Sequence, residues 1–244
     1  MLQITAISAF SDNYIWLIRE DNSSDCAVVD PGDAEPVIQY LNQNNLTLST
    51  ILLTHHHWDH TGGVKALSKR SPCIIHGPGL SETDGFQLFK REVKVKTIPG
   101  HTLDHIAFII DDKVFCGDTL FSAGCGRVFE GTFPQMLDSL NKLKSLHEDT
   151  KIYCGHEYTI NNLQFAQTVE PENNNIQDYL IECKNKRKTN KITLPSTIKL
   201  EKEVNPFFRC LENSVKTAAE NFCGKLLPRE VDVFAAIRTW KDQF

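Results

Sequence analysis

Four side chains that bind metal ions well lie within six residues of one another in this chain. They are His55, His57, Asp59 and His60, in the pattern His-x-His-x-Asp-His. Imidazole and carboxylate groups are the ligands that borderline divalent metals prefer. A polar surface loop that happens to be rich in histidine is the alternative. Ligand type and spacing together favour a metal site.

The sequence around this cluster predicts a loop between a strand and a helix. Residues 50–54 (TILLT) form an apolar, β-branched run typical of a buried strand, and residues 61–67 (TGGVKAL) resemble the start of a helix. Functional residues often lie on such loops, because the elements on either side form a rigid scaffold. We therefore expect the cluster to be held at the end of a strand.

Three later runs also end in a residue that can bind a metal. The predicted strand 92–98 is followed by Pro-Gly and His101, strand 113–116 by Gly117 and Asp118, and strand 151–154 by Gly-His156. A glycine directly precedes the ligand each time, where a tight turn is wanted. Gly-Asp alone would be ordinary turn chemistry. Four such strand ends together predict a common site.

Seven candidate ligands are more than one tetrahedral zinc ion can use. We predict two divalent ions, with Asp118 as the bridging ligand. Two ions about 3.5–4 Å apart can hold one hydroxide at neutral pH, because they lower the pKa of bound water to about 7. Such a hydroxide can attack a carbonyl group or a phosphorus atom. The predicted sets are His55, His57 and His101 for the first ion, and Asp59, His60 and His156 for the second.

The remaining histidines are not predicted to bind the metals. His56 alternates with ligands and should point away, while His76 and His147 are expected to be structural or exposed. His105 follows His101 by four residues, so a contact with a ligand is the alternative there. Zinc is the ion we expect, with iron and manganese as alternatives that the same ligands accept.

Bulk properties exclude several classes of protein. The chain has 244 residues, a net charge of −5 and a pI of about 6.0, which argues against a general nucleic-acid binder. No run is long enough to cross a membrane, and residues 1–7 lack the layout of a signal peptide. The eight cysteines form no C-x-x-C pair. We expect free thiols in a cytoplasmic protein, acting as a monomer on a small molecule.

The character of the sequence changes near residue 160. Before it, strand runs alternate with helices, including one predicted over residues 135–146. After it, helical spacing dominates, and we predict an extended connection at 193–205. The expected organisation is an α/β metal-binding catalytic domain over residues 1–160, followed by a smaller helical, substrate-binding domain over 161–244. The predicted later helices span residues 159–169, 175–186, 211–222 and 231–240.

The ligand pattern resembles the metallo-β-lactamase superfamily, and further motifs resemble its glyoxalase II (hydroxyacylglutathione hydrolase) branch from end to end. The resemblance implies an αββα sandwich with the metals at one edge. It also implies hydrolysis of S-lactoylglutathione and related S-2-hydroxyacylglutathiones, the second step of methylglyoxal detoxification. The motifs are Gly117-Asp118-Thr119-Leu120-Phe121, Gly124-Cys125-Gly126-Arg127, Glu130-Gly131-Thr132, Cys154–Thr159, Asn205-Pro206-Phe207 and Lys241–Phe244.

The same resemblance implies which residues act on the substrate. Arg127, Tyr158, Arg238 and Lys241 would bind the anionic glutathione moiety, and Asp59 would orient the attacking hydroxide as well as bind metal. Without the resemblance, Arg238 and Lys241 would be interpreted as a solvated pair on one helix face. Phe129 stands where some relatives have tyrosine, so one hydroxyl contact is expected to be missing.

Three other functions fit parts of the pattern. An RNA phosphodiesterase could use the same ligands, but the acidic charge balance disfavours it. A one-iron persulfide oxygenase would need open positions on a single redox metal, which seven intact ligands argue against. A metal-dependent binding protein without catalysis would show no thioester turnover when fully loaded with metal.

Overall fold

The computed structural model describes residues 1–244. The chain forms two units, each assembled from segments that are distant in sequence. The first unit comprises residues 1–97, 104–117 and 153–156, and the second comprises residues 98–103, 118–152 and 157–244. The predicted strand ends are therefore divided between the two units.

The first unit contains a five-stranded sheet in the order β1-β2-β3-β4-β5. Its first two pairings are antiparallel and its last two are parallel. Parallel neighbours need a crossover, which α1 (Ala34–Asn44) supplies before β4, and α2 (Trp58–Thr61) with α3 (Val64–Arg70) before β5. The strands are β1 (Leu2–Ala9), β2 (Asn13–Glu20), β3 (Asp25–Val29), β4 (Thr47–Leu52) and β5 (Ile74–His76).

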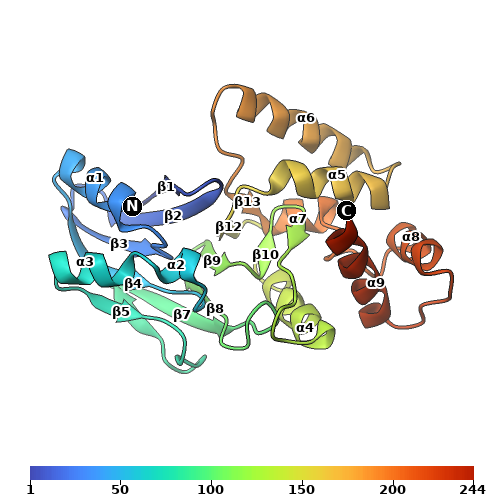
Figure 1. The fold of residues 1–244 in the computed structure, drawn as a ribbon, viewed down its shortest axis with the longest axis horizontal. Coiled ribbons are helices and arrows are strands. Elements are labelled where there is room, and N and C mark those ends of the chain that lie inside the picture. Colours follow the sequence, from blue (N-terminus) through green and yellow to red (C-terminus); the bar gives the residue numbers. More distant parts are fainter. The chain divides into compact units, whose positions relative to one another are not determined.

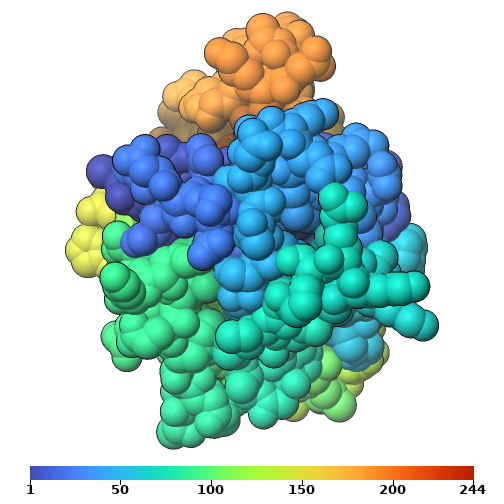
Figure 2. Space-filling view, turned by 90° about the vertical axis from the view of Figure 1, so that its left-hand side faces the viewer, coloured from blue at the N-terminus to red at the C-terminus, as the bar shows by residue number.

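A buried apolar layer joins this sheet to its helices. Val28 and Ile51 of the sheet share a core cluster with Val37 and Leu41 of α1 and Leu67 of α3. Figure 1 shows these helices, in blue and cyan, beside the N-terminal strands. In the space-filling view of Figure 2, segments from the N-terminal half of the chain, in blue to green, form this face of the first unit.

A second sheet has the order β13-β12-β9-β8-β7-β6. β12 belongs to both units, because its last two residues fall in the first. Trp16 of β2 packs edge-on against Tyr153 of β12, with ring centroids 4.9 Å apart, so side chains of the two sheets are in contact within the first unit. The strands are β6 (Phe86–Leu88), β7 (Arg91–Thr97), β8 (Ile106–Ile110), β9 (Lys113–Gly117), β12 (Lys151–Cys154) and β13 (Ser196–Thr197).

The second unit is mainly helical. Helices α5 and α6 share a buried cluster that also contains Ala123 and Val204. Phe207 lies between the rings of Phe165 and Phe234, at centroid distances of 6.2 and 5.8 Å. Its further elements are β10 (Leu120–Phe121), β11 (Gly124–Cys125), α4 (Phe133–Lys144), α5 (Thr159–Val169), α6 (Asn174–Lys188), α7 (Ile198–Val204), α8 (Asn213–Cys223) and α9 (Glu230–Gln243).

The extended connection predicted at 193–205 is wrong, because this segment contains α7. Thr197 caps the helix by accepting a hydrogen bond from the amide of Leu200. Ile198 and Val204 are buried, but between them the buried face carries Glu201. A charged residue at a core position hides the helical period from any prediction based on apolar spacing.

The structure confirms that all eight cysteines are free. None of the helices combines the length and the apolar character that crossing a bilayer requires.

Candidate metal centre and substrate-binding residues

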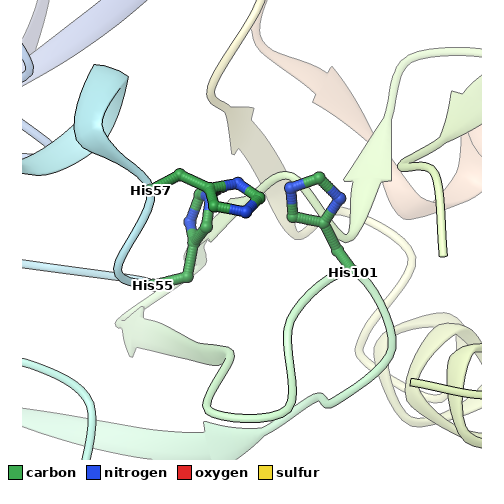
Figure 3. A group of neighbouring side chains, drawn as sticks. All are labelled: His55, His57 and His101. Atoms are coloured by element: carbon green, nitrogen blue, oxygen red, sulfur yellow. Dashed lines mark hydrogen bonds between the residues drawn. The ribbon is translucent and has the colours of Figure 1, made fainter. Parts of the chain in front are cut away.

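The loop after β4 carries two of the predicted ligands in contact. His55 Nε2 lies 3.2 Å from His57 Nδ1, and His55 is fully buried. Figure 3 draws these two side chains, which leave the loop between β4 and α2, together with His101, which comes from the loop after β7. His55 Nδ1 lies 3.0 Å from the hydroxyl of Thr54, which leaves Nε2 as its metal-binding nitrogen.

A second group in the first unit contains Asp59, His60 and His156. Asp59 Oδ2 lies 3.4 Å from His60 Nε2 and 3.5 Å from His156 Nε2. Two ligands about 2.1 Å from one tetrahedral ion lie about 3.4 Å apart, so these separations suit a shared cation. Their ligand atoms all lie within 4.8 Å of one another. The donor set therefore fits a divalent metal.

Asp30 forms hydrogen bonds with the loop after β4 and lies close to one predicted ligand. Its carboxylate accepts hydrogen bonds from the amide and the hydroxyl of Thr54, both at 2.7 Å, and lies 3.1 Å from His60 Nδ1. A carboxylate behind a histidine ligand fixes the ring and its tautomer. Sequence reasoning missed this role, although Asp30 ends a strand run just as Asp118 does.

The turn between β1 and β2 supplies two further contacts. His156 Nδ1 donates to Asp12 Oδ1 at 2.8 Å, and Asn13 Nδ2 donates to Asp59 Oδ2 at 3.0 Å. In the sequence, Asp12-Asn13 resembles an ordinary turn between two strands. Their contacts join residues 144 and 46 positions apart, so nothing local signals them.

The other histidines differ in their surroundings. His105 is buried and stacks on His55 with centroids 4.5 Å apart and planes at 13°, so it contacts a predicted ligand. His56 is exposed and its Nδ1 lies 3.0 Å from both carboxylate oxygens of Asp104. His76 stacks on Phe86, and burial lowers its pKa.

The second unit holds the remaining two predicted ligands close together. His101 Nε2 lies 3.6 Å from Asp118 Oδ2, and both side chains are buried. His101 Nδ1 donates to the main-chain oxygen of Arg127 at 2.8 Å. That bond directs Nε2 toward Asp118, as metal binding requires. His60, His101 and His156 thus each have an oxygen atom close to Nδ1.

At two positions beside these ligands, the backbone lies so close to neighbouring atoms that only glycine fits. Gly117, just before Asp118, has a φ of +48°, and a Cβ atom there would lie 2.2 Å from the hydroxyl oxygen of Thr54. A Cβ atom on Gly126 would lie 1.9 Å from the main-chain oxygen of Asp118. Real Cβ atoms essentially never approach so closely, so any larger residue would displace the ligand segment.

Two of the predicted substrate-binding cations share one carboxylate. Arg238 Nη2 lies 3.1 Å and Arg127 Nε 3.4 Å from Asp242 Oδ1. Arg238 is only 3% exposed, and its Nη1 donates to the carbonyl of Cys125 at 2.7 Å. The Arg127 side chain is 62% exposed. Arg238 is therefore held between Cys125 and Asp242 with little exposure, whereas the Arg127 side chain faces solvent.

Lys241, near the end of α9, reaches the first turn of α5, and Tyr158 immediately precedes that turn. The ammonium group of Lys241 donates to the side chain of Asn161 and lies 5.3 Å from the centre of the Phe165 ring. Burial, reinforced by the positive charge of Arg238, lowers the pKa of Lys241 to about 8. Tyr158 is the N-cap of α5 and is partly exposed. These groups suit a small anionic ligand.

Two family models match the chain. The model for the metallo-beta-lactamase superfamily matches residues 10–80 and 71–156, and the model for the hydroxyacylglutathione hydrolase C-terminus matches residues 157–244.

Named relatives match along their whole length. A hydroxyacylglutathione hydrolase of Psychromonas ingrahamii is 47% identical, and one of Vibrio cholerae is 49% identical. Each comparison covers 100% of this chain and 100% of the relative.

Solved structures support the fold. The crystal structure of ETHE1 from Myxococcus xanthus has a TM-score of 0.63 at 24% identity and covers 99% of this chain and 98% of its own. The B3 metallo-beta-lactamase BLEG-1 has a TM-score of 0.63 at 21% identity, covering 85% of this chain and 99% of its own. The predicted fold class is thereby confirmed, with a helical C-terminal region after the metallo-β-lactamase fold.

Proposed function

Because the chain belongs to the hydroxyacylglutathione hydrolase (glyoxalase II) family of the metallo-β-lactamase superfamily and is a thioester hydrolase, we propose that it cleaves S-lactoylglutathione by a two-metal mechanism. Full-length identity of 47–49% to relatives with that name supports the activity. The group of Asp59, His60 and His156, whose ligand atoms lie within 4.8 Å of one another, is the observation that carries the metal assignment.

The seven predicted ligands would hold the two ions in two sets of three with Asp118 as the bridge. When bound, the ions supply Lewis acidity and lower the pKa of a coordinated water to about 7. The contacts near Nδ1 of His60, His101 and His156 support this assignment, because each favours Nε2 as the metal ligand. Zinc is the ion we propose, with iron or manganese as alternatives.

Asp59 would both bind metal and orient the nucleophile. Its Oδ2 accepts from Asn13 at 3.0 Å, which fixes the carboxylate without neutralising it. The departing group is a thiolate, whose parent thiol has a pKa of about 8.5. Such a group leaves with little protonation, so the reaction needs no dedicated general acid.

The anionic peptide of the substrate would bind the cations of the second unit. Arg127, Arg238 and Lys241 gather at the last turns of α9 and the start of α5, and Tyr158 caps α5. This supports substrate binding by the helical region that we placed at residues 161–244, joined by Arg127 and Tyr158 from outside it. Arginine forks match carboxylates well, which suits the termini of glutathione.

The decisive experiment compares S-lactoylglutathione with a simple S-lactoyl thioester that lacks the peptide, with metal analysis of the same sample. We expect two metal ions per chain and a much larger kcat/KM for the glutathione thioester. Chelation should abolish turnover, and added metal should restore it. Full metal loading without turnover of either thioester would refute the hydrolase. One ion per chain would refute the two-metal mechanism.

We further propose that the enzyme acts in methylglyoxal detoxification as a cytoplasmic monomer. Eight free thiols suit a reducing compartment and support the location. Light scattering of the purified protein would test the monomer, since its mass should be close to 27.6 kDa.

A further inference from the structure

A fully buried carboxylate in the second unit has neutral hydrogen-bond partners. Glu201 of α7 is 0% exposed, and the groups that donate to it are a hydroxyl, a main-chain amide and a side-chain amide. Its oxygens accept hydrogen bonds from the hydroxyl of Ser122 at 2.9 Å, from the amide of Ala123 at 2.7 Å and from Asn205 Nδ2 at 3.0 Å. Burial raises the pKa of this carboxyl group.

Core packing alone does not explain this group. Removing a carboxylate from water is unfavourable, and an apolar residue of similar volume is often at least as stabilising in such a position. Glu170, by contrast, is buried in the same unit but paired with Arg209 through two hydrogen bonds. Glu201 instead bonds to Ser122 and Ala123, which lie between β10 and β11, so its role is to be sought in that turn.

Glu201 and Asn205 together hold the turn between β10 and β11. Asn205 Nδ2 also donates to the carbonyls of Phe121 at 3.2 Å and Gly124 at 3.0 Å. Ala123, between them, has a φ of +55°, a conformation that a non-glycine residue adopts at a cost. Hydrogen bonds to both sides of the turn stabilise this conformation.

The turn leads directly into the predicted peptide-binding cations. Cys125, the last residue of β11, accepts a hydrogen bond from Arg238 at 2.7 Å, and Arg127 follows two residues later. Both guanidinium groups reach Asp242 Oδ1. A shift of the turn would therefore change the spacing between the two arginines.

We propose that Glu201 is a positioning residue for substrate recognition, which sets the spacing of Arg127 and Arg238 through the β10–β11 turn so that they bind the carboxylates of a glutathione thioester. This inference rests on the proposed function, and it also gives a role to the Asn205-Pro206-Phe207 and Gly124-Cys125-Gly126-Arg127 motifs. Glu201 itself is fully buried and does not touch the substrate.

The test measures binding of S-methylglutathione, a thioether that cannot be hydrolysed, together with steady-state kinetics on S-lactoylglutathione. In metal-loaded Glu201→Leu, we expect the Kd and KM to rise about ten-fold, with kcat within about two-fold of the wild type. Metal content should not change. Glu201→Gln should bind nearly normally, because its amide oxygen can still accept from Ala123 while its nitrogen donates to Ser122.

Glu170→Leu is the matched control, since it removes a buried carboxylate of the same unit that does not contact the turn. It should lose stability while keeping its affinity for S-methylglutathione. Should Glu201→Leu fail to fold, Ser122→Ala removes one of the same bonds and should weaken binding by about three-fold.

If Glu201→Leu binds S-methylglutathione as tightly as the wild type, the positioning role is overturned. If Glu201→Leu does not fold, the same result in Ser122→Ala overturns it. Equal weakening in Glu170→Leu would overturn it as well. A wild-type enzyme that neither binds S-methylglutathione nor hydrolyses the thioester would refute the proposed function instead.

Discussion

Asp12 Oδ1 accepts a hydrogen bond from His156 Nδ1 at 2.8 Å, across 144 residues of sequence. The bond leaves Nε2 of this ring on the side of Asp59. We predict that Asp12→Ala lowers metal affinity by about ten- to a hundred-fold, because a histidine ligand that loses its outer carboxylate loses its orientation and basicity. Metal content after dialysis against a graded series of chelator concentrations would measure the change.

Asp149→Ala is the control, because Asp149 pairs with His147 at 3.7 Å on the surface. That variant should retain metal like the wild type. Equal metal retention in Asp12→Ala and Asp149→Ala would show that the bond to Asp12 does not orient a ligand.

Loss of a predicted metal ligand should remove metal and activity together. We predict that His57→Ala and Asp118→Ala each lower the metal content and reduce kcat by at least about a thousand-fold, since the nucleophile depends on the ions. His147→Ala, at an exposed histidine, should change neither. A His57→Ala or Asp118→Ala enzyme with both ions and a near-normal rate would end the ligand assignment for that residue.

Substrate affinity should depend on pH through Lys241. The pKa of Lys241 is lowered to about 8, so its ammonium group is charged below that pH and becomes neutral as the pH rises through it. Only the charged form attracts the carboxylates of the substrate. We therefore predict that KM for S-lactoylglutathione rises between about pH 7.5 and 9, with kcat much less affected.

Lys241→Arg separates this titration from the titration of the substrate. Arginine stays protonated throughout this range, so the rise in KM should flatten in that variant. A KM profile that is unchanged by the substitution would assign the pH dependence to another group.

Gly117 should be intolerant of any side chain. Its φ of +48° and the 2.2 Å approach of a Cβ atom to Thr54 Oγ1 combine backbone strain with a clash. We predict that Gly117→Ala lowers the free energy of unfolding by about 3 kcal/mol or more, as strain and overpacking add. Chemical denaturation of the metal-loaded protein would measure it.

Gly224→Ala provides the comparison, because Gly224 has a φ of +67° and a Cβ atom added there would have no neighbouring atom within 4 Å. Strain alone should lower the free energy of unfolding by about 1 kcal/mol there. Similar losses in both variants would mean that the contact with Thr54 is easily relieved.

Strand ends were the most predictable part of this molecule. The predicted strand at 151–154 matches β12, and the runs that lead to His101 and Asp118 match β7 and β9 within a residue or two. These runs are short and apolar or alternating, and glycine marks where each one stops. Ligand chemistry could then be inferred directly from the residue that follows.

Contacts between distant segments could not be predicted in the same way. Asp12, Asn13 and Asp30 resemble ordinary turn residues, and only the folded chain brings them to His156, Asp59 and His60. Helix α7 was missed for a related reason, because its buried face includes a carboxylate. Polar residues that serve tertiary contacts disturb the very periodicity on which sequence reasoning depends.

The main chain and the side chain of Arg127 make separate contacts. Its main-chain oxygen anchors His101, while its exposed guanidinium group reaches Asp242. Replacing the side chain leaves the peptide oxygen in place. Substitutions at position 127, by design or in evolution, could therefore change which thiol part of the substrate is preferred. The hydrogen bond to His101 would remain.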